Sequence, residues 1–311
     1  MTIKRDLSNL PTATSNRGGR PPDANPRFVH LLVEAMKVAN DKAGEKPTAY
    51  GTRIRHSDAG KCARAVAYSA ARIPRSNPMD LPGVWVTSLG TLIHEKWQEA
   101  LQAAVPAEVE VKLRIDGLDA SGHADAVIPE ADYRILFELK TVGGFSWKMK
   151  VGERSDPEGP SYEHIAQGAL NAKAIDAFEM VIGYIATEAV SKPAAKRKNL
   201  DELARFCGEW TFSRDEYEAV ALVEQHRLQG ILDLLDKGLL AARKIPSPEL
   251  PPGAEIVDPK TGRWQVSGPD GIVDTGSFWA CGYCSWQDTC AKTESGRIPV
   301  ESVPVKIGEA A

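Results

Sequence analysis

Long hydrophobic runs are missing from this 311-residue sequence. No stretch approaches the roughly 20 apolar residues that a membrane-spanning helix needs, and the first residues lack the apolar segment of a secretion signal. We therefore expect a cytoplasmic protein with no membrane partner. An excess of positive charge is missing too, because 38 Lys and Arg residues face 42 Asp and Glu residues, for a net charge of −4. A nucleic acid would have to meet a local basic patch, since the whole chain offers no attractive field.

Cysteine is scarce, with five residues in the chain. In a reducing compartment such cysteines are expected to be ligands or core residues, not disulfides. The remaining composition is ordinary, 42% hydrophobic and 26% charged, which is enough for a hydrophobic core. The chain is predicted to consist of a flexible tail rich in Gly, Pro, Ser and Asn at 1–26, one domain at 27–295 and a second tail at 296–311.

Helical and strand patterns alternate along the chain. Apolar residues at helical spacing predict long helices, and runs rich in β-branched residues predict strands. Helices are expected at 27–42, near Cys62, at 84–105, at 161–175 and from the capping box at 213–216 to about 243, and strands at 107–114, 120–128, 133–142 and 178–187. This mixture indicates an α/β or α+β fold.

The stretch "SGHADAVIPEADYRILFELKTV" at 121–142 places charges of both signs inside a predicted hairpin. If Ile128 and Tyr133 close its turn, Asp125 lies opposite Leu136 and on the same face as Glu138 and Lys140. Two carboxylates at that range can share a hard divalent cation, and a lysine beside them can hold a water or a phosphate oxygen. The alternative is an exposed edge hairpin with a surface salt bridge, which contributes little.

Four short motifs around this hairpin resemble those of a nuclease superfamily. "GHAD" at 122–125 and "ELK" at 138–140 are similar to the core motif of the PD-(D/E)XK nucleases, without the usual proline before the aspartate. Gly90 and His94 resemble the G-x-x-x-H element of the RecB-like branch. Gln167 stands at the place of that branch's Q-x-x-x-Y motif, with Asn171 replacing the tyrosine. His164, Gln167 and Asn171 share one helical face and could line a substrate groove.

Three of the cysteines, Cys281, Cys284 and Cys290, form a C-x2-C-x5-C motif near the end of the chain. Three soft ligands need a fourth, and Cys62 is the candidate because Cys207 sits among core-like residues. One early and three late cysteines around a nuclease core resemble the iron–sulfur nucleases, which include the CRISPR-associated RecB-like exonucleases and the nuclease domain of AddB. That resemblance implies a 4Fe–4S cluster at these four cysteines, and zinc is the alternative.

The resemblance implies a restriction-endonuclease-like α/β fold with a central mixed sheet flanked by helices. Its core would span about 84–190, and an iron–sulfur clasp at about 57–72 and 278–292 would join the two ends of the domain. It also implies a metal-dependent DNA exonuclease that acts on DNA ends, with single-stranded DNA as the expected substrate. The roles it implies are Mg²⁺ or Mn²⁺ binding by His94, Asp125, Glu138 and the Leu139 carbonyl, orientation of water by Lys140, and positioning of substrate or Lys140 by Gln167.

Contacts to DNA are expected from two local basic clusters. Phosphates meet Lys and Arg side chains, and an exposed aromatic ring can stack on an unpaired base. The candidate residues are Trp147, Lys148 and Lys150 after the second hairpin strand, and Lys196, Arg197 and Lys198 in an expected loop. A solvated surface is the alternative for each cluster. A non-catalytic DNA-binding module and an iron–sulfur electron carrier stay open as other functions, and a recombination or helicase protein is compatible as a further partner.

Overall fold

The computed structural model describes residues 35, 38, 50–147, 159–197, 199–242, 255–258, 263–267, 273–277, 281, 283–294 and 296–304. The predicted tail at 1–26, all but two residues of the predicted helix at 27–42, and the basic residues Lys148, Lys150 and Lys198 lie outside the described residues.

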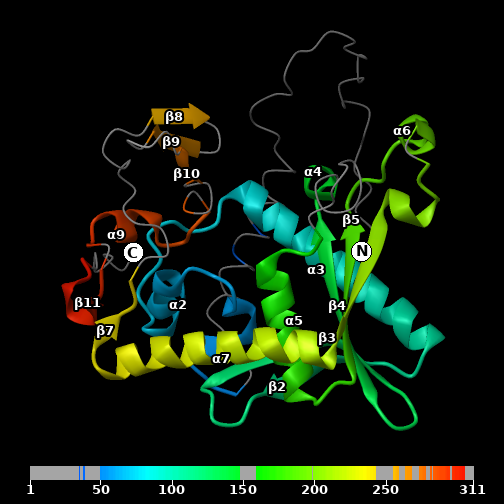
Figure 1. Ribbon diagram of the computed structural model, residues 1–311, viewed down its shortest axis with the longest axis horizontal. Coiled ribbons are helices and arrows are strands. Elements are labelled where there is room, and N and C mark those ends of the chain that lie inside the picture. The colour runs from blue at the N-terminus through cyan, green and yellow to red at the C-terminus, as the bar shows by residue number, and fades with distance from the viewer. Residues whose placement is uncertain are drawn as a thin grey trace, which may run out of the picture.

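The main sheet is mixed and six-stranded (Figure 1). Its strands are β1 (Ile54–Arg55), β2 (Glu108–Arg114), β3 (Ala120–Pro129), β4 (Arg134–Val142), β5 (Glu179–Ala186) and β6 (Cys207–Ser213). The order is β1-β3-β4-β5-β6, with β2 paired to β3. β1 and β3, and β4 and β5, run parallel, whereas the other pairs are antiparallel. The predicted α/β class, with a central mixed sheet, is therefore confirmed.

The β3–β4 hairpin has a different register from the predicted one. Ile128 pairs with Ile135 and Val127 with Leu136, so the pairing is shifted by two residues. The turn is held by the Glu130 N–H, which donates to the Tyr133 carbonyl at 2.9 Å. Because side chains alternate along a strand, a shift by two keeps each strand's faces, whereas a shift by one would have exchanged them.

Helices cover both faces of the sheet. α3 (Leu81–Ala104) packs on one face, where the ring of Trp97 stacks on Phe137 at 4.7 Å. α5 (Tyr162–Ala174) and α7 (Arg214–Asp236) belong to the larger core on the other face. The Asp80 carboxylate caps α3 by accepting from the Gly83 N–H, and the predicted capping box of Ser213 and Glu216 opens α7.

The C-terminal segment returns to the N-terminal part of the fold, next to α2 (Ala63–Ala70), as Figure 1 shows. The shorter elements are η1 (His56–Asp58), α4 (Gly144–Trp147), α6 (Lys192–Arg197), η3 (Leu203–Arg205), β7 (Leu239–Leu240), the sheet of β8 (Glu255–Asp258), β9 (Arg263–Ser267) and β10 (Val273–Ser277), α9 (Gln287–Ala291), β11 (Ile298–Pro299) and η4 (Val300–Ser302). β11 pairs with β7, so residues 298–299 of the predicted C-terminal tail are part of the fold. Within the described residues, no helix is long and apolar enough to cross a membrane.

Candidate active site

Asp125 lies where β3 changes partner. β1 pairs with β3 at Ala120 and Ser121, whereas the pairing with β4 begins only at Ala126. Between these two paired segments, the Asp125 carboxylate accepts a hydrogen bond from the Leu139 N–H at 2.8 Å. A side-chain oxygen thus stands where a backbone carbonyl would accept in a regular sheet. The local change of partner therefore aims the Asp125 side chain at the middle of β4.

Glu138 and Lys140 form an ion pair on β4. Lys140 Nζ lies 2.9 Å from Glu138 Oε2 and 3.6 Å from Asp125 Oδ2, and the Glu138 side chain is 0% exposed. The shifted register thus still brings together the three charged groups that the sequence singled out. The result is one ammonium held between two carboxylates.

The electrostatic environment affects the three groups differently. Burial raises the pKa of Glu138, and the charge of Asp125 adds to this effect against the opposing influence of Lys140. For Asp125, burial alone would raise the pKa, but His94, Lys140 and the Leu139 N–H together lower it. Burial would lower the pKa of Lys140, yet the two carboxylates outweigh it and raise the value. Lys140 therefore carries its positive charge at neutral pH.

α5 brings two amides to the Glu138 carboxylate. Gln167 Nε2 lies 3.5 Å from Glu138 Oε2, at the limit of a hydrogen bond. Asn171 Nδ2 donates to Glu138 Oε1 at 2.6 Å, and Asn171 is completely buried. The hypothesis that Asn171 lines a substrate groove is therefore wrong. Gly168 permits this close approach, because a Cβ atom there would lie 2.7 Å from Met180 Sδ.

His94 reaches the site from α3. Its Nδ1 atom is 3.7 Å from Asp125 Oδ1, and the two side chains are 23% and 14% exposed. Within the described part of the chain, no three His, Cys, Asp or Glu side chains are arranged as a ready-made metal site. The donors near Asp125 are nevertheless an imidazole and two carboxylates, the chemistry that Mg²⁺ and Mn²⁺ accept.

A cavity of about 570 Å³ opens beside the charged cluster. It is lined by His94 and Lys140, by His164 of α5, by Thr187 and Glu188 after β5, and by apolar residues from the first half of α3. Trp85 lies on this lining and is 54% exposed. Trp147, predicted to stack on a base, is only 2% exposed and is packed in the core, so that prediction is wrong.

Three residues of this site were not predicted from the sequence. His56 follows β1 directly and contacts Asn171, and Gln98 of α3 donates to the Asp125 carbonyl at 3.3 Å. No local pattern marks either residue, because their partners are distant in sequence. The sequence does contain a sign of Trp85. Apolar residues lie on several sides of the first half of α3, whereas a helix that packs on a core with one face needs only one apolar stripe.

The four cysteines of the predicted clasp come from the two ends of the domain, and none of them forms a disulfide within the described residues. Burial raises the pKa of the Cys284 thiol, and the nearby Cys62 and Cys290 raise it further. The Cys284 N–H donates to the Cys281 carbonyl at 3.0 Å, so these two cysteines share one turn of the chain. Cys207 opens β6, and its Sγ atom lies 3.3 Å from the Leu203 carbonyl oxygen.

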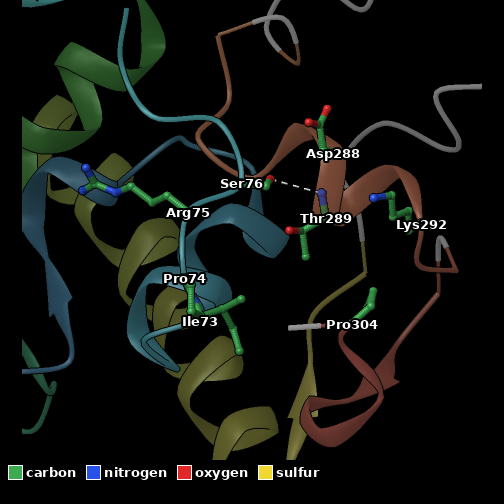
Figure 2. A pocket seen from close by; sticks show the side chains of 8 residues that line it. All are labelled: Ile73, Pro74, Arg75, Ser76, Asp288, Thr289, Lys292 and Pro304. Atoms are coloured by element: carbon green, nitrogen blue, oxygen red, sulfur yellow. Dashed lines mark hydrogen bonds between the residues drawn. The ribbon is translucent and has the colours of Figure 1, made fainter. Parts of the chain in front are cut away.

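Direct protein contacts join the same two ends. Trp286 Nε1 donates to the Ile73 carbonyl at 2.9 Å, and the Thr289 N–H donates to Ser76 Oγ at 3.1 Å. Figure 2 shows the second contact at the edge of a cavity of about 460 Å³ between the segment after α2 and α9. The guanidinium of the buried Arg64 reaches the Thr293 side chain at 3.2 Å. The early and late cysteine segments are therefore neighbours.

Comparison with known proteins gives distant structural similarities. No family model matches the sequence, and no curated protein matches it. A crystal structure described as SSO0001 is 18% identical, with a TM-score of 0.43 over 66% of this chain and 87% of that chain. An alkaline exonuclease from Laribacter hongkongensis is 12% identical, with a TM-score of 0.32 over 49% of this chain and 72% of that one. A phage-related exonuclease from Haemophilus somnus 129PT is 10% identical, with a TM-score of 0.30 over 48% and 73%.

Proposed function

We propose that this protein is a metal-dependent deoxyribonuclease that hydrolyses phosphodiester bonds at DNA ends, with single-stranded DNA as its main substrate. The observation that carries the proposal is the lysine ammonium held between two carboxylates, 2.9 Å from one and 3.6 Å from the other, at the wall of an open cavity. Such a group can neutralise charge that develops on a phosphate, and the carboxylates can hold a cation beside it.

The chain's own residues have distinct roles in this proposal. His94, Asp125, Glu138 and the Leu139 carbonyl would hold Mg²⁺ or Mn²⁺, since nitrogen and oxygen donors suit both ions. The bound ion would lower the pKa of a water molecule and offset charge on the phosphate. Lys140, which is protonated, orients the attacking water, and Gln167 supports the Glu138 oxygen that faces Lys140.

The most direct test uses protein purified without oxygen and end-labelled DNA, single- and double-stranded, with and without Mn²⁺. Cleavage of the single strand from its ends, only with the metal, is the expected result. Binding without any cleavage would show a non-catalytic DNA-binding module. Neither binding nor cleavage would contradict the proposal altogether.

A 4Fe–4S cluster held by Cys62, Cys281, Cys284 and Cys290 is the second part of the proposal. Its support is the contact between the early and late cysteine segments, which come from opposite ends of the domain, although within the described residues no three cysteines form a ready-made metal site. Each thiolate of such a cluster binds a different iron, so the ligands stand further apart than around a single zinc ion. The cluster would have a structural role, because it joins segments that already contact each other.

Trp85 is expected to bind an unpaired base of the substrate strand. Replacing it with alanine should weaken single-stranded DNA binding by about 1–3 kcal/mol, or roughly 5- to 150-fold in Kd, because one base no longer stacks on the protein. Double-stranded DNA should be affected much less, since its bases are already stacked on each other. Titration of both DNAs by fluorescence anisotropy measures the difference.

Phe178→Ala is the matched control, because Phe178 is equally exposed but packs on Tyr133 at the start of β4, away from the cavity. Equal effects of Trp85→Ala and Phe178→Ala would remove Trp85 from the binding surface.

The basic cluster at 196–198 is expected to contact the DNA backbone. Lys196 and Arg197 are exposed at the end of α6, which corrects the predicted loop. β4 and β5 run parallel, so the chain that leaves β5 toward α6 emerges at the same edge of the sheet as Lys140. Changing Lys196, Arg197 and Lys198 to alanine should weaken binding and lower the slope of log affinity against log salt by about 0.7 for each phosphate that is no longer neutralised. Lys112→Ala with Arg114→Ala is the control, because both are exposed on β2, which does not line the cavity. An unchanged slope in the 196–198 variant would show a solvated surface.

A further inference from the structure

A chain of buried hydrogen bonds leads from His56 to the Glu138 carboxylate. His56 Nδ1 lies 2.7 Å from Asn171 Oδ1, and Asn171 Nδ2 donates to Glu138 Oε1 at 2.6 Å. His56, Asn171 and Glu138 are all 0% exposed. The three groups are therefore shielded from bulk water.

The direction of each hydrogen bond follows from the partners. Asn171 Nδ2 faces two acceptors, the Glu138 carboxylate and the His123 carbonyl at 3.0 Å, so this atom is the amide nitrogen. The amide oxygen consequently faces His56, and His56 Nδ1 must be the donor. Burial lowers the pKa of His56 more than the Asn171 amide and the Ala120 carbonyl raise it. His56 is thus a neutral imidazole with its proton on Nδ1.

Gly122 leaves room for this chain of contacts. A Cβ atom at this position would lie 2.7 Å from both Asn171 Oδ1 and His56 Nδ1. The glycine of the "GHAD" motif is therefore required at the point where the side chains of α5 and η1 meet over β3. At Gly122 the pairing of β3 with β1 has ended, and its pairing with β4 begins only at Ala126, so neither strand occupies this space.

We propose that His56 and Asn171 are positioning residues that hold the Glu138 carboxylate in a single orientation, with His56 acting through Asn171. Glu138 Oε1 is occupied by the amide, so Oε2 is the oxygen presented to Lys140 at 2.9 Å. This inference rests on the proposed nuclease function for its effect on rate. The hydrogen bond from His56 to Asn171 can be measured without any activity.

A pair of substitutions of similar size separates positioning from packing. Asparagine at position 56 keeps an N–H donor close to the place of Nδ1, whereas leucine keeps an apolar volume and removes the donor. A packing role predicts that leucine is tolerated at least as well as asparagine, because only the apolar volume at position 56 would then matter. A positioning role predicts the opposite order in kcat. We expect His56→Leu to lower kcat about 10- to 100-fold, as for residues that orient a metal ligand, with KM for DNA unchanged, and His56→Asn to keep most of the activity.

A double-substitution cycle tests whether His56 acts through Asn171. In the Asn171→Leu background, His56→Leu should change kcat by less than about twofold, because the connecting amide is already gone. Full additivity of the two effects would overturn the proposal, as would a kcat for His56→Leu equal to or above that of His56→Asn.

The tautomer of His56 gives a readout that needs no cleavage. Long-range ¹H–¹⁵N spectra of the unmodified protein should show one neutral imidazole protonated on Nδ1, absent from the spectrum of His56→Asn, and its tautomer preference should disappear in Asn171→Leu. Protonation on Nε2 in the unmodified protein would overturn the proposal. If the unmodified protein cleaves no DNA but shows the Nδ1–H tautomer, the nuclease function fails while the hydrogen bond from His56 to Asn171 stands.

Discussion

Replacing Glu138 by glutamine or Lys140 by methionine is expected to lower the rate of DNA cleavage at least about 100-fold while DNA binding persists. Both substitutions keep the length of the side chain, so they change charge and hydrogen bonding with little change in volume. The Glu138 carboxylate lies between two donors, the Asn171 amide and the Lys140 ammonium. Glutamine has a single oxygen to accept with, so its N–H groups would face one of these two donors and that hydrogen bond would be lost. Methionine at 140 would remove the positive charge between Asp125 and Glu138.

The measurements are single-turnover cleavage of end-labelled DNA with Mn²⁺, DNA binding without metal, and thermal unfolding of each variant. A surface pair on α3 provides the matched control, because Lys96 and Glu99 lie 2.7 Å apart with side chains 83% and 68% exposed. Lys96→Met and Glu99→Gln should leave the rate unchanged, since exposed pairs contribute little. Near-normal rates in both the Glu138 and Lys140 variants would place the active site elsewhere.

The contacts of the charged cluster show which parts of a site can be predicted from a sequence. Asp125, Glu138 and Lys140 were found because alternation along strands is a local property that survives a register shift of two residues. The actual shift placed Leu136 opposite Val127, and the Asp125 carboxylate bonded to the Leu139 N–H instead of following a regular ladder. That bond depends on β3 changing partner, which only the assembled sheet reveals.

Burial was the harder property to predict. The sequence pattern favours a substrate surface for Trp147 and Asn171, yet both are in the core, because neither a helical face nor a strand end shows in the sequence which neighbour will cover it. His56 and Asn171 are 115 positions apart, and their contact arises from the meeting of η1, β3 and α5. The start of α7 was predicted better, since capping residues act within one turn: α7 begins at its capping box, as expected. Its end was predicted wrongly, because the helix stops at Asp236 and not near 243.

Replacing a cysteine of the predicted clasp is expected to have the other large effect, on iron content and stability. Serine at Cys62, Cys281, Cys284 or Cys290 is expected to remove the iron and to lower the free energy of unfolding by several kcal/mol, as the removal of a structural metal centre does. Serine at Cys207 is the matched control and should do neither. Cys207 lies at the start of β6 beside the Leu203 carbonyl, and the thiols that act on Cys284 are Cys62 and Cys290.

The expected decrease in stability follows from what the cluster would connect. The ends of the domain are already joined by the hydrogen bonds from Trp286 to Ile73 and from Thr289 to Ser76, and by the buried Arg64, which reaches Thr293. A cluster that ties position 62 to position 281 closes a loop of most of the chain, so its removal frees many conformations of the unfolded state. Iron, sulfide and zinc analysis of protein made without oxygen, together with denaturant unfolding of each variant, provides the measurement. One zinc and no iron would exclude the cluster and keep the clasp, whereas full iron in Cys62→Ser would show that the fourth ligand lies elsewhere.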